Sequence, residues 1–175
     1  MKLDRYEYSS TQINLPPNLT SRIIRWGKDS IPEDQVYKVF NEPGYGREGE
    51  IHVTVLYGLH ETSPDRLRDI LNTQDLFHVR LGKVTSFTNP DKFDVVKVDV
   101  ESPELHQLNT LLRTKFHYTS NFPVYRPHVT IAYVKKGLKV SSDVFEGMEF
   151  TVGKLKFSSR SGAKYELPLK GKPAS

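Results

Sequence analysis

The sequence predicts an α+β fold, bilobal and duplicated about a pseudo-twofold axis, with mainly antiparallel sheets, flanking helices and a central cleft. The first observation behind this prediction is a repeated phrase: residues 52–58 read His-Val-Thr-Val-Leu-Tyr-Gly, and residues 128–134 read His-Val-Thr-Ile-Ala-Tyr-Val. The second is that turn-forming residues join the strand-like segments as hairpins, which favours antiparallel pairing over crossover connections. The length of 175 residues suits one domain, residues 1–175, made of two closely packed lobes.

The first third of the chain predicts one strand, two helices and a loop. Residues 6–15 have the composition of a strand and stop at two prolines. Residues 18–28 carry apolar side chains at helical spacing, and a second short helix is expected within 31–40. Residues 41–50 hold three glycines and a proline, which predicts a connecting loop or a mobile flap over a site.

The rest of the chain predicts two further helices and two equivalent hairpins. Ser-Pro pairs open helices at 63–72 and 102–116, because proline is tolerated in the first turn of a helix. Residues 77–100 and 148–169 share a Phe-x-Val spacing and each crosses a turn. We therefore expect these two hairpins to superpose when one lobe is rotated onto the other. Residues 118–125 are expected to form a loop that leads into the second copy of the phrase.

Each copy of the repeated phrase is expected to be a strand, because its residues are apolar and β-favouring. Side chains alternate between the two faces of a strand, so His52 shares a face with Thr54, and His128 shares a face with Thr130. By the same alternation, the tyrosine of each copy is expected to point away from this face, into the core. A polar pair that is repeated on two buried strands predicts two half-sites facing each other. A reaction that needs one proton acceptor and one proton donor requires such an arrangement.

Composition narrows the classes of function. The chain has no cysteine, which excludes disulfides and thiolate metal sites. No apolar run approaches the roughly 18 residues of a membrane span, and the N-terminus lacks the apolar core of a signal peptide. These features predict a cytoplasmic protein with no membrane partner and no evident obligate protein partner. A formal net charge of +4 favours an anionic partner such as a nucleotide or RNA.

The two tetrads carry a resemblance to a known family. Residues 52–55 (His-Val-Thr-Val) and 128–131 (His-Val-Thr-Ile) resemble the paired His-x-[Ser/Thr]-hydrophobic motifs of the two-histidine (2H) phosphoesterase superfamily. This superfamily includes RNA 2′,5′-ligase-like proteins and cyclic phosphodiesterases, and the repeat organisation of the chain agrees with it as well. The stretches Tyr-Ser-Ser-Thr-Gln-Ile-Asn-Leu-Pro and His-Val-Thr-Val-Leu-Tyr-Gly-Leu-His are similar to a phage anti-CBASS branch. Some members of that branch degrade cyclic oligonucleotide signals of antiphage defence, which would place a phage-encoded protein in the host cytoplasm.

The resemblance implies a metal-independent phosphodiesterase without a cofactor, acting on cyclic nucleotides or on 2′-5′- or 3′-5′-linked oligonucleotides. Of His52 and His128, one would accept a proton from the nucleophile and the other would protonate the leaving oxygen, since imidazole changes its charge near neutral pH. Thr54 and Thr130 would donate hydrogen bonds to the non-bridging phosphate oxygens. The repeat is too symmetric to show which histidine is the base.

Three further residues are candidates for substrate binding. Arg126 precedes His128 by two positions and is expected to share its face, where a guanidinium can pair with phosphate; a surface salt bridge is the alternative. Tyr8 and Tyr125 are aromatic side chains that can stack on a nucleobase, unless they only pack the core or a loop. A glutamate occupies the matching position before the first histidine, so the difference between acid and base is expected there.

Three other functions stay open at this level. A zinc site would use His52, His60 and His128, but the chain has no HExxH motif and no paired carboxylates at ligand spacing beside them. A non-catalytic nucleotide- or RNA-binding module of the same fold is the second alternative, although both tetrads are intact. RNA 2′,5′-ligation is the third, because it is the reverse of cleavage and the sequence does not reveal the direction.

Overall fold

The computed structural model describes residues 6–88, 90, 92–120 and 122–170. The elements follow one another as β1 (Ser9–Asn14), α1 (Pro17–Ser30), the 3-10 turn η1 (Glu33–Gln35), β2 (His52–Leu59), α2 (Asp65–Leu71), β3 (Phe77–Thr88), β4 (Phe93–Glu101), α3 (Pro103–Lys115), β5 (His128–Lys135), β6 (Glu149–Val152), β7 (Lys154–Ser158) and β8 (Lys164–Pro168).

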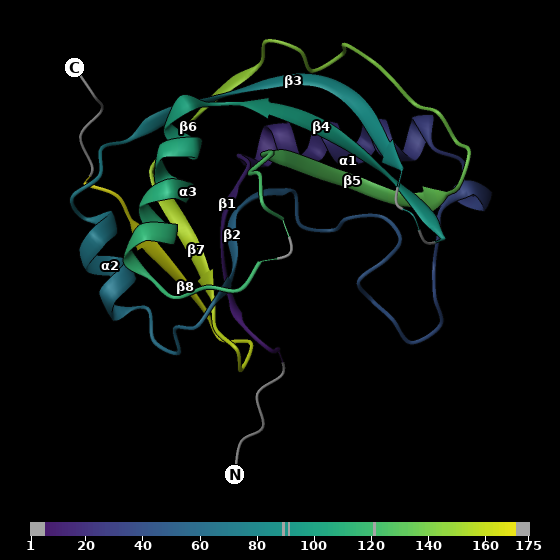
Figure 1. Cartoon of the computed structure of the whole chain (residues 1–175). Coiled ribbons are helices and arrows are strands. Elements are labelled where there is room, and N and C mark those ends of the chain that lie inside the picture. Colours follow the sequence, from purple (N-terminus) through teal and green to yellow (C-terminus); the bar gives the residue numbers. More distant parts are fainter. Residues whose placement is uncertain (1–5, 89, 91, 121, 171–175) are drawn as a thin grey trace.

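The strands form one curled sheet in the order β6-β3-β4-β5-β2-β1-β7-β8 (Figure 1). Neighbouring strands run antiparallel throughout, so the predicted α+β class with mainly antiparallel pairing is confirmed. The two motif strands, β2 and β5, lie at the centre, and three further strands follow on each side. The two halves meet through a single residue pair, Val53 and Val129, and therefore belong to one continuous sheet.

The prediction that residues 77–100 and 148–169 are equivalent hairpins is wrong. In the first half, β4 of the β3–β4 hairpin lies directly beside the motif strand β5. In the second half, the strand beside the motif strand β2 is the N-terminal β1, and the β7–β8 hairpin lies further out with β8 at the sheet edge. The segment 148–158 also divides at Gly153, since β6 pairs with β3 and β7 pairs with β1. These pairings are non-local, so the local spacing of residues does not reveal them.

The helices lie close to their predicted positions and cover one face of the sheet (Figure 1). α1 packs against β5, α3 packs against β2 and β3, and α2 packs against β8. The helix α3 is capped by Ser102, whose hydroxyl accepts a hydrogen bond from the Leu105 amide at 3.2 Å. The helix expected within 31–40 is only the three-residue turn η1, after which Val36 forms a bridge with Val134 of β5. Within the described residues, no helix has the length and apolar character of a membrane span.

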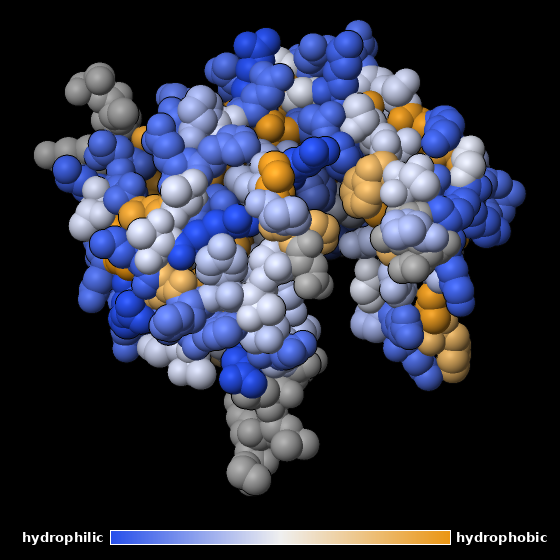
Figure 2. All heavy atoms as spheres, viewed as in Figure 1, coloured by the Kyte–Doolittle hydropathy of each residue, from blue (hydrophilic) through white to orange (hydrophobic). Residues whose placement is uncertain are grey.

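The glycine-rich stretch is a loop, as predicted, and it projects from the body beside β5 (Figure 1). Its end remains attached to the sheet, because the Glu48 amide donates to the Ile131 carbonyl and the Tyr133 amide donates to the Gly46 carbonyl. Figure 2 shows an open notch between this projecting loop and the rest of the molecule. The loop therefore forms one wall of a recess at the side of the sheet.

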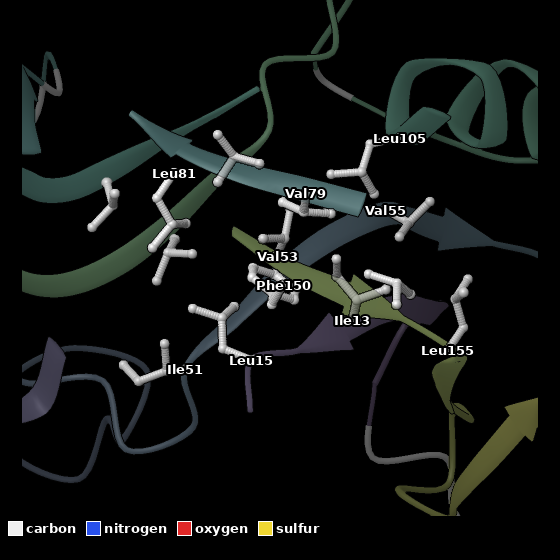
Figure 3. Packing of buried hydrophobic residues seen from close by; sticks show 14 of the residues in the cluster. Ile13, Leu15, Ile51, Val53, Val55, Val79, Leu81, Leu105, Phe150 and Leu155 are labelled. Atoms are coloured by element: carbon white, nitrogen blue, oxygen red, sulfur yellow. The ribbon is translucent and has the colours of Figure 1, made fainter. Parts of the chain in front are cut away.

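The residues between the polar positions of the motif strands anchor these strands in the core. Val53 and Val55 are fully buried, and they lie in one cluster with Ile13 of β1, Leu105 of α3 and Leu155 of β7 (Figure 3). Burying each such side chain contributes about 1.5–3 kcal/mol. This packing holds the backbone of the motif in place and sends the histidine and threonine to the opposite face.

Gly58, at the end of the first motif, is expected to be the most sensitive glycine of the chain. Its φ is 97°, and an added Cβ would lie 1.8 Å from the Thr119 carbonyl oxygen, against which this part of β2 is docked. We predict that Gly58→Ala lowers the free energy of unfolding, measured by urea denaturation, by at least about 2 kcal/mol. Gly49→Ala is the matched control, because nothing lies within 4 Å of a Cβ there. Equal unfolding midpoints for the two variants would contradict the prediction.

Candidate active site

The structure places all four tetrad residues on the same face of the sheet, where its two halves join. Val53 pairs with Val129, and both side chains are buried in the core. Extending this antiparallel register by one residue on each side sets His52 opposite Thr130 and Thr54 opposite His128. Each histidine therefore lies beside the threonine of the other motif, and the two histidines lie diagonally across the junction.

Each histidine ring is hydrogen-bonded to the backbone carbonyl of the residue two positions before it. His52 Nδ1 lies 2.6 Å from the Glu50 carbonyl oxygen, and His128 Nδ1 lies 2.9 Å from the Arg126 carbonyl oxygen. A carbonyl oxygen can only accept a hydrogen bond, so each Nδ1 carries the proton. Each Nε2 is then the atom that gains or loses a proton, which is the arrangement that acid–base chemistry requires.

The neighbours of His52 form a network of amides and charges. On β1, Asn14 lies opposite His52, and the amide nitrogen of Gln12 donates to Asn14 Oδ1 at 2.8 Å and to Glu50 Oε1 at 2.6 Å. Lys156 of β7 forms an ion pair with the same Glu50 oxygen at 2.7 Å. The network therefore fixes the side chain of the residue whose carbonyl orients His52.

The carboxylate of Glu50 stays ionised beside His52. Burial raises the pKa of Glu50, but the hydrogen bond and charge of Lys156, together with the charges of Lys164 and His52, hold it below its ordinary value. The ionised carboxylate attracts a positive charge on His52. The carboxylate of Glu50 is therefore a negative charge beside the first imidazole.

The neighbours of His128 are arranged differently. On β4, Asp99 lies opposite His128 and Lys97 lies opposite Thr130. Lys97 forms an ion pair with Asp99 and donates a hydrogen bond to Thr85 Oγ1 at 2.9 Å, and the Thr85 hydroxyl donates to Asp99 Oδ2 at 3.1 Å. Thr85 and Asp99 therefore hold the ammonium group of Lys97, the residue that pairs with the second threonine.

His128 is biased toward its neutral form. Burial lowers the pKa of His128; the hydrogen bond to the Arg126 carbonyl and the charge of Asp99 act against this, whereas the charges of Lys97 and His52 act with it. The net result is a pKa below that of an ordinary imidazole.

A matched pair of β-bulges corrects the prediction for the two tyrosines of the motif. The register skips Val55 in β2 and Ile131 in β5, which is the fourth position of the phrase in both copies. An extra residue reverses the alternation beyond it. Tyr57 therefore lies opposite Ser10 on the histidine face and is half exposed, and Tyr133 lies on this face as well, covered by Tyr45 of the projecting loop. The expectation that both tyrosines belong to the core is wrong.

The three predicted substrate-binding residues have different surroundings. Arg126 is exposed, and its guanidinium forms no hydrogen bond or ion pair with another described residue. The Tyr125 hydroxyl donates to the Thr54 carbonyl oxygen at 2.8 Å, and its ring packs on His106 of α3. Burial raises the pKa of Tyr125 well above its ordinary value, so the hydroxyl stays a donor. Tyr125 thus braces the backbone of the motif strand from the helix side of the sheet.

The remaining candidate, Tyr8, lies at the other end of β2. It stacks on His60, with ring centroids 5.0 Å apart, and meets Tyr57 edge-on at 6.4 Å. His60 bonds to Thr119 Oγ1 at 2.8 Å. The three histidines of the zinc alternative are therefore not brought together, since His60 lies eight residues along the chain from His52, just past the far end of β2. In the described ranges, no group of three or more His, Cys, Asp and Glu side chains could hold a metal ion.

Sequence reasoning missed the residues that flank the motif strands. The alternation of side chains along each of these strands can be predicted from the sequence. Which strands lie beside β2 and β5 cannot, and it is this pairing that brings the residues to the site. They share the histidine face and come from β1, β3, β4 and β7: Gln12, Asn14, Thr85, Phe87, Lys97, Asp99 and Lys156.

The comparisons with known proteins agree with this architecture. The structure is similar to the crystal structure of TT0787 of Thermus thermophilus, with a TM-score of 0.67 and 16% identity over 94% of this chain and 98% of that one. It is also similar to E. coli LigT complexed with 3′-AMP, with a TM-score of 0.60 and 19% identity over 93% and 95% of the two chains. Usb1 of Kluyveromyces marxianus matches with a TM-score of 0.59 and 11% identity over 94% and 99%. At these identities the likeness shows the fold.

The sequence, rather than the structural likeness, identifies the family. No curated protein sequence matches the chain. The family model of the 2′-5′ RNA ligase superfamily matches residues 29–164, which include both tetrads and most of the sheet. The resemblance to the two-histidine phosphoesterases is thereby confirmed, and the chain belongs to the 2′-5′ RNA ligase superfamily.

Proposed function

We propose that the protein is a metal-independent phosphodiesterase that cleaves cyclic nucleotides or 2′-5′- or 3′-5′-linked oligonucleotides, as a single-domain enzyme of the cytoplasm. The observation that carries the proposal is the pair of imidazoles on one face of the sheet, each with Nδ1 bound to a carbonyl and Nε2 left for proton transfer. The structural neighbour LigT has been solved with 3′-AMP, ATP and NADP+, which supports a nucleotide as the ligand.

The surroundings of the two histidines support an assignment of the acid and the base. His128, whose pKa burial lowers, is the general base, and its Nε2 takes the proton of the attacking hydroxyl. His52, beside the ionised carboxylate of Glu50, is the general acid, and its Nε2–H protonates the leaving oxygen. The new P–O bond forms as the bond to the leaving oxygen breaks, and one proton moves at each end.

The remaining polar groups act on the phosphate itself. Thr54 and Thr130 lie between the two histidines, and their hydroxyls can donate to the non-bridging oxygens, on which negative charge increases in the transition state. Lys97, which pairs with Thr130 across the β4–β5 ladder, adds a positive charge on the same face. Donors that the fold holds in place need no reorganisation during the reaction, which is why such groups are effective.

The direct test is turnover in the presence of EDTA. We expect the protein to cleave at least one member of a panel of 2′,3′-cyclic nucleotides, 2′-5′- and 3′-5′-linked oligonucleotides and cyclic oligonucleotides, with products separated by chromatography and no loss of rate on chelation. Cleavage of a cyclic oligonucleotide would support the antiphage-signalling role of the phage branch. Activity that EDTA abolishes and zinc restores would contradict the proposal. Binding without turnover of any member would support the non-catalytic module instead.

The Lys97–Asp99 pair gives a prediction for the pH profile. The rate should rise as His128 loses its proton, and the midpoint of this rise should lie below about pH 6.5, since the pKa of His128 is lowered. Lys97→Met removes a charge that lowers this pKa, so the rise should move to higher pH. Asp99→Asn removes a charge that raises it, so the rise should move to lower pH. Profiles of kcat/KM for the three proteins check the signs, and shifts in the same direction would exclude His128 as the base.

A further inference from the structure

We propose that the site holds a dinucleoside phosphodiester, with one nucleobase stacked on Phe87 and the other on Tyr57. Each half of the sheet then supplies one aromatic platform, and the four tetrad residues hold the phosphate between them. This inference rests on the proposed function and narrows its substrate to phosphodiesters that carry a nucleoside on both sides. A linear dinucleotide unit and a cyclic dinucleotide share this chemistry.

Phe87 is the platform on the side of His128. It lies opposite Val95 on the β3–β4 pair, two residues beyond Thr85, and therefore shares the histidine face with Thr85 and Lys97. Its ring centroid lies 6.2 Å from that of His128, at an interplanar angle of 76°, and the side chain is 39% exposed. An apolar ring that stays partly open beside a catalytic imidazole is positioned to receive a flat apolar ligand.

Tyr57 is the platform on the other side. The bulge at Val55 brings it onto the face of Thr54, from which it lies three residues, or about 10 Å, along the strand. Its ring is 50% exposed. The ring of Tyr8 meets it edge-on at 6.4 Å and is itself stacked on His60, so the tyrosine is supported from behind.

The two platforms suit a phosphodiester because its two ester oxygens lead to two nucleosides. A phosphate held at the junction of β2 and β5 sends one nucleoside toward each half of the sheet. A ring that is held by its neighbours loses little conformational entropy when a base stacks on it, and stacking does not depend on which base is present. Phe122 provides the contrast, since it is 75% exposed but stands in the loop beside α3, whose residues line a groove on the helix side of the sheet.

The test is the KM of Phe87→Ala and Tyr57→Ala on substrates with one and two bases. The two-base substrates are the 3′-5′- and 2′-5′-linked diadenosine monophosphates and cyclic di-AMP, and the one-base substrate is 2′,3′-cyclic AMP. Loss of one base stack corresponds to a rise in KM of about 5- to 100-fold. We expect both variants to show this rise on a two-base substrate, with kcat changed much less, and only one of them to show it on 2′,3′-cyclic AMP.

Controls separate the platforms from a general loss of structure. Phe122→Ala should leave KM unchanged, and Phe87→Trp and Tyr57→Phe should keep it near that of the unmodified protein because a flat ring remains. The same measurements distinguish a linear from a cyclic ligand. A rise in KM on the diadenosine monophosphates indicates a linear one, and a rise on cyclic di-AMP indicates a cyclic one. An unchanged KM in both alanine variants, or cleavage of 2′,3′-cyclic AMP alone by the unmodified protein, would overturn this inference and leave the phosphodiesterase proposal intact. No turnover of any substrate would overturn the proposed function instead.

Discussion

Replacing His128 or His52 by alanine is expected to reduce kcat/KM by about 10²- to 10⁴-fold, because each removes one of the two proton transfers. In the proposed mechanism the two histidines act in the same step, so the double variant should be little slower than the slower of the single variants. His128→Ala should also remove the rising part of the pH profile, since His128 is the proposed base and its lowered pKa sets that part. Steady-state kinetics on whichever substrate of the panel is cleaved fastest measures all three effects.

His117→Ala is the matched control for these variants, because His117 is exposed outside the sheet and its backbone carbonyl accepts from the His60 amide, just past the end of β2. Its rate should equal that of the unmodified protein. Full activity in the His52→Ala, His128→Ala double variant would remove the catalytic assignment and leave a binding module. Strictly additive losses would indicate that the two side chains act in separate steps.

Replacing Thr54 or Thr130 by valine should reduce kcat by at most about 10²- to 10³-fold, less than the loss of either histidine. Valine keeps the branched shape that the strand favours and removes only the hydroxyl, so the loss reports the hydrogen bond to the phosphate. Thr130→Val is expected to be the milder of the two, because Lys97 pairs with Thr130 and its positive charge on the same face still attracts the phosphate.

Thr151→Val on the edge strand β6 is the control, since Thr151 contacts His78 and lies far from the motif strands in the sheet order. Activity should be unchanged in this variant. If Thr54→Val and Thr130→Val also kept full kcat, the threonine hydroxyls would not bind the phosphate. The hydrogen-bond donors to the phosphate would then be expected among Gln12, Asn14 and Lys97.

The positions of α1, α2 and α3, the antiparallel class and the two tetrads could be predicted from the sequence. Ser102-Pro103 marks the start of α3 because the serine side chain caps the helix and proline needs no amide partner there. His52 and Thr54 share a face because the valines between and after them are buried, a relation that follows from the alternation of a strand. These are local properties, and a local pattern of residues encodes them.

Which residues surround the tetrads depends on the pairing of strands that are distant in the sequence. The N-terminal β1, and not a strand of the last hairpin, lies beside β2, and β4 brings Lys97 and Asp99 to His128. The bulges at Val55 and Ile131 turn the motif tyrosines onto the histidine face, although an unbroken alternation predicts the opposite. The lowered pKa of His128 likewise arises from burial and from charges that other strands bring to it. Pairing between distant segments sets all of these features, so the two nearly identical tetrads acquire different surroundings only when the sheet has formed.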